Sequence, residues 1–261
     1  MTPMKHCKNC NKLLKGNYCS NCGQKATTGR ITFRYLLEIV IHTFAHIEKG
    51  FLYTSKELLI RPGKTMHDYL TGHRKKLESP VGYIVVWVGL EWLTRKVVIS
   101  LMGYKFLHSV YETPDYERAR SFYDQHSSWF VFIIVPFVAS IIYLLMGKPR
   151  YNLAEMAAIT LYGFGTYHIF QLFTSTVLLG VVFQVNIRSW QIGVFYNVIG
   201  AVWTFWSLYD FFKSVHLNNF WVRLIATCLL ILFVENVLVL FLPLLLFKLF
   251  GIDWFIRQLV V

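Results

Sequence analysis

Four cysteines near the start of the sequence have the types and the spacing of a metal site. The segment "CKNCNKLLKGNYCSNCGQ", residues 7–24, contains two Cys-x-x-Cys pairs, formed by Cys7, Cys10, Cys19 and Cys22. Zinc prefers soft ligands at four tetrahedral corners, and each Cys-x-x-Cys turn supplies two of them. Four thiolates leave no open coordination position, so the spacing predicts a structural Zn²⁺ site rather than a catalytic one.

The residues around these pairs bear on the choice of metal. Asn11 and Gly23 follow the two pairs, and both residue types readily take the positive φ that turns backbone N–H groups toward sulfur. Haem attachment would need histidine at these positions and is excluded. The opening segment "MTPMKHCKNC" has no secretory signal, which predicts a cytoplasmic head whose thiols bind metal rather than form disulfides. An iron site of the same geometry and idle thiols stay open as alternatives.

A second group of possible ligands follows in an apolar stretch. Glu38, His42 and His46 are spaced i, i+4, i+8, so they can share one face of a helix. Carboxylate and imidazole groups at this spacing could bind a second metal ion. Alternatively, the two histidines lie at an interface and form hydrogen bonds with water or neighbouring groups.

Further along the chain, polar side chains interrupt long apolar runs. We expect a polar pocket within the helices, lined by His168, Gln171, Asn197 and Glu235. Such a pocket could pass protons, hold a lipid headgroup or carry acid–base chemistry. The alternative is that these groups form hydrogen bonds between helices and only fix their packing.

The composition favours a membrane protein. Of the 261 residues, 55% are hydrophobic and 15% are charged, whereas a soluble domain has about 25% charged residues. The net charge is +12, and 14 of the 26 basic residues lie in residues 1–80. Basic residues concentrated beside apolar runs fit a membrane protein with its basic side in the cytoplasm, so nucleic-acid binding is not expected.

Five apolar runs are long enough to span a bilayer. They are residues 82–103, 128–147, 153–185, 190–212 and 220–249. The predicted fold class is an all-α multi-pass membrane helical bundle of about five spanning helices, with a small N-terminal zinc ribbon. The predicted location is the cytoplasmic (inner) membrane, with the N-terminus cytoplasmic and the C-terminus outside. The predicted domains are the ribbon at 1–26, juxtamembrane helices at 27–80 and the bundle at 81–261.

The juxtamembrane segment has helical apolar spacing broken by charges. This pattern predicts amphipathic helices on the cytoplasmic face of the membrane. Pro62-Gly63 is expected to end the first helical region, and a second helix is expected to run up to Pro80. The run Arg74-Lys75-Lys76 is expected to face solvent or anionic lipid headgroups, which makes the lipid bilayer a predicted partner.

Three motifs resemble those of a known family. "YCSNCGQ", "HIEKGFLYTSKELLIRPG" and "YLTGHRKKLESP" are similar to segments of an uncharacterised bacterial membrane family, catalogued as domain of unknown function 3667. This chain has Gly72-His73-Arg74 where the family often reads Gly-Lys-Arg, and Met156 where a histidine is expected. The resemblance implies an architecture and no reaction.

No enzyme motif stands out in the sequence. It has no Ser-His-Asp order, no P-loop and no nucleotide-binding glycine pattern. This leaves enzymatic activity open and favours its absence. The leading hypothesis is a non-enzymatic binding or adaptor protein, whose cytosolic ribbon engages an unknown protein partner at the membrane. The alternative is an intramembrane enzyme or transporter that acts on a lipid or small solute at a pocket with His168 and Glu235.

Overall fold

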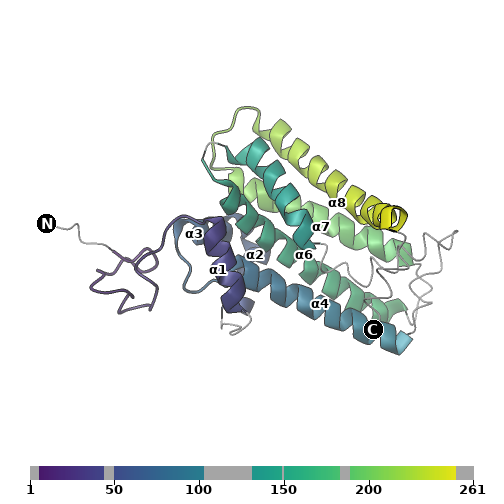
Figure 1. The fold of residues 1–261 in the computed structure, drawn as a ribbon, viewed down its shortest axis with the longest axis horizontal. Coiled ribbons are helices and arrows are strands. Elements are labelled where there is room, and N and C mark those ends of the chain that lie inside the picture. The colour runs from purple at the N-terminus through teal and green to yellow at the C-terminus, as the bar shows by residue number, and fades with distance from the viewer. Residues whose placement is uncertain (1–5, 44–49, 103–130, 149, 183–188, 251–261) are drawn as a thin grey trace.

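The chain is mainly helical in the computed structural model, which describes residues 6–43, 50–102, 131–148, 150–182 and 189–250 (Figure 1). A helix at residues 131–142 runs into the π-helical η2. The other helices and η2 are α1 (Phe33–Thr43), α2 (Phe51–Ile60), α3 (Pro62–Thr71), α4 (Pro80–Met102), η2 (Tyr143–Gly147), α6 (Leu153–Val182), α7 (Ser189–Phe212) and α8 (Phe220–Phe250).

The long helices form one body, with α6 at its centre. α6 contacts α4 and α7, and it also contacts η2 and the three short helices α1, α2 and α3. Figure 1 shows α4, α6, α7 and α8 running side by side, with α1 to α3 gathered at one end. The cysteine-bearing N-terminal segment extends beyond that same end. The arrangement places the cysteines next to the short helices and away from the far ends of the long ones.

Aromatic side chains fill the region where α3, α4 and α6 meet. The rings of Tyr69 and Tyr83 each pack edge-to-face on Tyr162, with centroids 5.5 and 5.6 Å apart. All three tyrosines are buried. A Cβ atom at Gly165 would lie 2.5 Å from the Tyr83 ring, so glycine at this position allows α4 and α6 to approach. The short helices thus share a core with the long ones.

The start of α3 is fixed against α7. Pro62 occupies the first turn of α3, where the missing N–H costs nothing. The N–H of Gly63 donates to Asp210 Oδ2 at 2.8 Å, so a carboxylate lies at the positive end of the helix. A Cβ atom at Gly63 would lie 2.3 Å from the backbone of Asp210. The two backbones can pack this closely only because residue 63 has no side chain.

The short helices follow the predicted pattern only in part. A helix ends just before Pro62, as expected, since α2 ends at Ile60. The next helix begins at Pro62 itself and ends at Thr71, well before Pro80. Gly72 has φ +109°, and the N–H groups of Gly72 and His73 donate to carbonyls of the last turn. This is a Schellman cap, which ends α3 early.

The prediction of a multi-pass membrane bundle is wrong. Within the part of the chain that the structure describes, no helix is both long and apolar enough to cross a membrane. Helices do occur at the five predicted apolar runs. Part of their apolar residues pack against one another in a shared core, whereas others, such as Leu229 and Phe233 on α8, are exposed. A helix that is apolar on most faces is found in such a core as well as in a bilayer. Hydropathy alone cannot separate the two. Residues 103, 128–130 and 183–185 of those runs lie outside the described residues.

Candidate metal centre

The N-terminal segment, residues 6–26, consists of two copies of one turn and is called the ribbon below. In the first copy, the N–H of Cys7 donates to Lys12 O at 2.8 Å; in the second, the N–H of Cys19 donates to Gln24 O at the same distance. Each copy closes with an antiparallel bridge, His6 to Leu13 and Tyr18 to Lys25. The two turns therefore correspond residue by residue with an offset of twelve, so that Cys7 is equivalent to Cys19 and Lys12 to Gln24.

Each turn bends at the residue that follows its second cysteine. Asn11 has φ +59° and Gly23 has φ +71°, as the sequence predicts. Their N–H groups donate to Cys7 O and Cys19 O, both at 2.8 Å. The left-handed conformation is open to glycine and tolerated by asparagine, which explains these two residue types at these positions.

The turns bring the four thiols into one cluster. All four sulfur atoms lie within 4.8 Å of one another. Cys7 Sγ lies 3.6 Å from Cys22 Sγ, and Cys10 Sγ lies 3.5 Å from Cys19 Sγ. A tetrahedron with Zn–S bonds of about 2.3 Å has edges of about 3.8 Å. The cluster is therefore close enough to bind one metal ion, and its dimensions are consistent with zinc.

The surroundings of the sulfurs differ in their effect on ionisation. The backbone N–H of Lys12, followed by the side chain of Asn21, lowers the pKa of the Cys10 thiol to about 6. Backbone N–H groups also lower the pKa of Cys19. Burial raises the pKa of Cys22 to about 11, and the neighbouring sulfurs add to this effect. Four thiolates at this spacing need a cation to offset their repulsion, so metal binding would release protons and weaken as the pH falls.

Gln24 holds the ribbon on the helical body. Its side chain is only 6% exposed. Its Nε2 donates to Gly72 O at 2.8 Å, and its Oε1 accepts from the N–H of Arg74 at 3.2 Å. The primary amide thus pairs with both backbone groups of the turn that follows α3. Lys8 supports this contact, because its side chain lies against Gly72 and its Nζ donates to Thr28 O at 2.7 Å.

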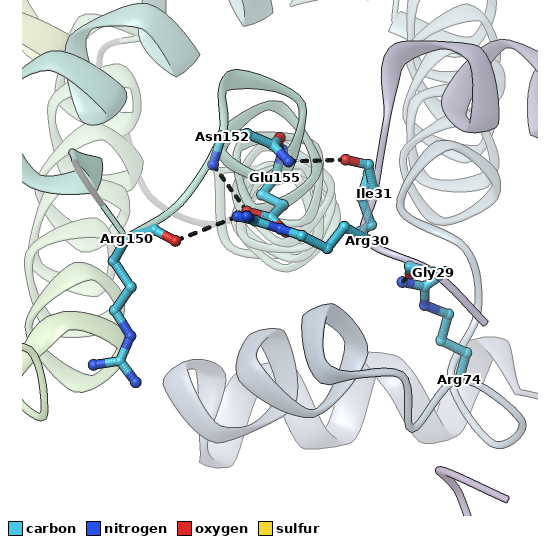
Figure 2. A network of polar contacts seen from close by, with 7 residues as sticks. All are labelled: Gly29, Arg30, Ile31, Arg74, Arg150, Asn152 and Glu155. Carbon is cyan, nitrogen blue, oxygen red and sulfur yellow. Dashed lines mark hydrogen bonds and ion pairs between the residues drawn. The ribbon is translucent and has the colours of Figure 1, made fainter. Parts of the chain in front are cut away.

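The chain that follows the ribbon is fixed to the start of α6 (Figure 2). Arg30 donates from Nε and Nη2 to the two carboxylate oxygens of Glu155, at 2.8 and 2.6 Å. Its Nη2 also donates to Arg150 O at 3.3 Å, and Asn152 Nδ2 donates to Ile31 O at 3.1 Å. Glu155 is buried, whereas the Arg30 side chain is 62% exposed. The link between ribbon and body is therefore a structured segment.

A capping box at the start of α6 orients this carboxylate. The N–H of Glu155 donates to Asn152 Oδ1 at 2.8 Å, and the N–H of Asn152 donates to Glu155 Oε2 at 2.9 Å. These two bonds satisfy backbone donors that the helix itself cannot use. They also fix the Glu155 side chain where Arg30 can bind both of its oxygens.

Arg74 is a structural residue rather than a surface charge. Its Nη2 donates to Gly29 O at 2.9 Å and its Nε to Tyr69 O at 3.0 Å. The guanidinium also lies over the rings of Tyr35 and Tyr69, 5.0 and 5.1 Å from their centroids. Of the run Arg74-Lys75-Lys76, only the two lysines are exposed.

The possible second metal site is only partly within the described residues. Glu38 is exposed on α1 and forms an ion pair with Arg34 at 3.1 Å. His42 belongs to α1, but its side chain lies outside the described part, and so does the whole of His46. The proposed grouping of the three side chains stays a prediction.

The predicted polar pocket residues lie on three helices. His168 is buried in α6 and Gln171 is half-buried there. Asn197, on α7, accepts a hydrogen bond from the Tyr167 hydroxyl at 2.9 Å. Asn197 and Glu235 line a common pocket, whereas His168 and Gln171 are not among its lining residues. Met156, the residue expected as histidine, is fully buried in the core.

Three residues that build the metal centre's support were missed by the sequence reasoning: Gln24, Arg30 and Glu155. The Asn152-x-x-Glu155 pattern before an apolar run is a capping-box signature and could have marked Glu155 as a fixed carboxylate. No local pattern joins Arg30 to a residue 125 positions away. That contact depends on the tertiary fold.

Comparison with known protein families matches a part of the chain. Residues 48–90 match the model of a family described as "Protein of unknown function (DUF3667)". The matched segment contains α2, α3 and the first part of α4, together with the Gly72–Arg74 turn on which the ribbon packs. No curated protein and no solved structure matches the chain.

Proposed function

We propose that this chain, part of which is similar to a family described as of unknown function, is a non-enzymatic binding protein. Its ribbon, folded around one Zn²⁺, would present a rigid basic surface to an acidic surface of a protein partner. The observation that carries the proposal is the combination of a closed Cys₄ cluster with a ribbon fastened to the helical body at several points.

The donor set supports a structural role for the metal. All four candidate ligands are cysteine sulfurs. A zinc ion bound by four thiolates has no position left for water or substrate, so it cannot act as a Lewis acid at that site. A segment of this size cannot bury a core of its own, and metal binding would supply its folding free energy.

The attachment of the ribbon supports a recognition role. Gln24 pairs with the turn after α3, Arg74 binds the carbonyl of Gly29, and Arg30 binds Glu155. A surface held at fixed orientation loses less entropy when a partner binds than a freely moving one. A ribbon that served only as a spacer would need none of these contacts.

The charge of the ribbon indicates the chemistry of its partner. Between residues 6 and 31 there is no acidic residue. The exposed side chains of this segment include Lys8, Lys12, Lys15 and Lys25. Tyr18 lies among them with 64% of its surface exposed. Aromatic residues are enriched in binding interfaces, and a basic surface favours acidic partners.

Pairwise charge reversal on the full-length chain tests the proposal. Lys12→Glu/Lys15→Glu changes the exposed face of the ribbon and leaves the cysteines in place. Lys64→Glu/Lys76→Glu makes the same charge change at exposed positions outside the ribbon. Affinity capture with wild type and both variants should recover a partner with wild type and with the second variant, and lose it with the first. Elemental analysis should find equal zinc in all three.

Other outcomes would contradict the proposal. Equal recovery by all three proteins would show that the ribbon surface does not bind the partner. Captured material that disappears after nuclease treatment would identify nucleic acid as the ligand of this basic surface. Zinc-free wild-type protein would remove the structural basis of the ribbon.

A further inference from the structure

A pocket in the helical body contains no ribbon residue. It lies between α6, α7 and α8, with side chains from α3 and from the 131–142 helix completing its wall. Its cavity volume is about 70 Å³, which is room for several water molecules, and the pocket is partly open to the surface. Most of its wall is apolar or aromatic, including Ile142, Phe164, Trp203 and Leu208.

Several polar groups of the wall already have partners. The hydroxyl of Thr160 donates to Met156 O at 2.8 Å, and that of Ser207 donates to Thr204 O at 2.9 Å. Each bond joins two residues of the same helix, α6 for Thr160 and α7 for Ser207. These hydroxyl protons are used by the fold itself, so they are not what a ligand would complete.

Trp203 and Glu235 are lining residues without such a partner among the described residues. Trp203 is 6% exposed, and its Nε1–H has no acceptor among the described residues. Glu235 lies in the pocket wall, and burial alone acts on its carboxyl group, with no hydrogen bond or ion pair from the described part of the chain. The buried, unpaired N–H of Trp203 costs free energy, and the half-buried Glu235 adds a carboxyl group to the same pocket. Together they indicate a ligand that offers both a hydrogen-bond acceptor and a donor.

We propose that this pocket binds a small, mainly apolar molecule whose polar end carries a protonated nitrogen and a hydrogen-bond acceptor. The nitrogen donates to the Glu235 carboxylate, and the acceptor takes the proton of Trp203 Nε1–H. Apolar and aromatic walls cover the rest of the ligand. Trp203 can also contribute a ring face to the cation.

The charge of the wall selects for such a ligand. The other titratable lining residues are Tyr167 on α6 and Cys228 on α8, and no Lys, Arg or His lines the pocket within the described residues. Burial raises the pKa of Glu235 to about 7 and that of Cys228 to about 11. Above neutral pH the wall therefore carries one negative charge, which attracts an ammonium group and repels a carboxylate. Binding of the amine should strengthen between pH 5 and pH 8.

A glycine in the wall offers a way to fill the pocket. A Cβ atom at Gly163 would meet nothing within 4 Å, and Gly163 lines the pocket. Gly163→Leu should therefore occupy the ligand volume without displacing the surrounding helices. Gly89 on α4 is also free of neighbours within 4 Å and is not a lining residue, so Gly89→Leu is the matched control.

Isothermal titration of the full-length protein with 2-(octylamino)ethanol tests the proposal, with octanol and octanoate as comparison ligands. We expect the amino alcohol to bind most tightly at pH 8 and octanoate to bind at least tenfold more weakly. Glu235→Gln should weaken amine binding about tenfold or more, and Trp203→Phe, which keeps an aromatic ring, should weaken it several-fold. Gly163→Leu should abolish binding, and Gly89→Leu should leave it unchanged.

Several results would overturn the proposal. Absence of amine binding to wild type would do so directly. Equal affinity for the amine and octanoate would show that only apolar contacts drive binding and that the charge of Glu235 plays no part. Unchanged amine binding in Gly163→Leu, in a variant with wild-type thermal stability, would place the ligand elsewhere.

Discussion

The ribbon and the helical body are stabilised by different means. In the ribbon the buried side chains are Cys7, Cys19 and Gln24, of which two are candidate metal ligands and one binds the body. In the body, a continuous set of buried apolar side chains extends from α1 to α8. With the proposed ion bound, the ribbon's structure depends on that ion and on its support, whereas the body's depends on many dispersed contacts. The two regions should therefore unfold under different conditions.

The largest difference should come from removing the metal. Chelation, or Cys19→Ser/Cys22→Ser, is expected to unfold the ribbon completely, because structural zinc supplies about 10–16 kcal/mol in small zinc-binding peptides. The helices should persist, since their core contains none of the cysteines of the ribbon. Limited proteolysis should then cleave rapidly at Tyr18, while far-UV circular dichroism keeps its helical signal.

The fifth cysteine supplies the control for this prediction. Cys228 lies on α8, so Cys228→Ser should keep the metal and the resistance of the ribbon to proteolysis. A ribbon that stays resistant after its metal is removed would show that docking alone folds it. Loss of helical signal with the metal would show that ribbon and body form one cooperative unit.

The two regions should also respond to pH with opposite sign. Glu235 has a pKa of about 7 in the folded chain against an ordinary value of 4.5. Between these values the folded state holds a proton that the unfolded state has lost, so the contribution of Glu235 to the stability of the body is most favourable below about pH 4.5 and declines as the pH rises to 7. The loss is at most about 3 kcal/mol. The metal proposed for the ribbon, in contrast, should be released as the pH falls.

Glu235→Gln isolates the contribution of this carboxyl to the body. The variant should match wild type in urea denaturation near pH 4, and it should be more stable than wild type at pH 8 because an amide cannot ionise. Equal stability of the two proteins at pH 8 would show that the carboxylate is solvated. Metal content, measured in parallel, should follow pH identically in both proteins.

The sequence predicts the local features well and the relations between regions poorly. The Cys-x-x-Cys spacing and the residues Asn11 and Gly23 predict both turns, because this geometry is set within a few residues. Helical periodicity likewise places the long helices. Hydropathy, however, reports only that a face is apolar and not what covers it, so the apolar runs packed around α6 led to the wrong prediction of membrane spans.

The support of the ribbon is beyond sequence reasoning for a similar reason. Gln24 occupies the position in the second turn that Lys12 occupies in the first. Nothing in the neighbouring sequence indicates that Gln24 is buried and Lys12 is not. Its partners, Gly72 and Arg74, are 48 and 50 residues away. Polar side chains that join distant segments leave no periodic pattern, so their role becomes visible only in the fold.

The contact between the link and α6 should contribute less to stability than the metal of the ribbon or the core of the body. Arg30→Ala removes the partner of a buried carboxylate and is expected to destabilise the fold by about 2 kcal/mol, less than for a fully buried pair because Arg30 is largely exposed. Arg34→Ala breaks an ion pair in which both groups are exposed and should have no measurable effect. Urea denaturation of both variants tests this. Equal effects would mean that the Arg30–Glu155 contact is no stronger than a surface pair.

The smallest effect should come from the contact that joins ribbon and body directly. Gln24→Ala leaves Gly72 O and the N–H of Arg74 without their side-chain partner and should cost about 1 kcal/mol. Lys12→Ala, at the equivalent position of the first turn, changes an exposed side chain and should cost nothing measurable. Hydrogen exchange at the backbone N–H of Arg74 measures this contact directly. Protection from exchange should fall in Gln24→Ala and persist in Lys12→Ala, and both variants should retain zinc. If Arg74 stays protected without Gln24, the ribbon is held by Lys8 and the link instead, and its fixed orientation does not depend on the amide bridge.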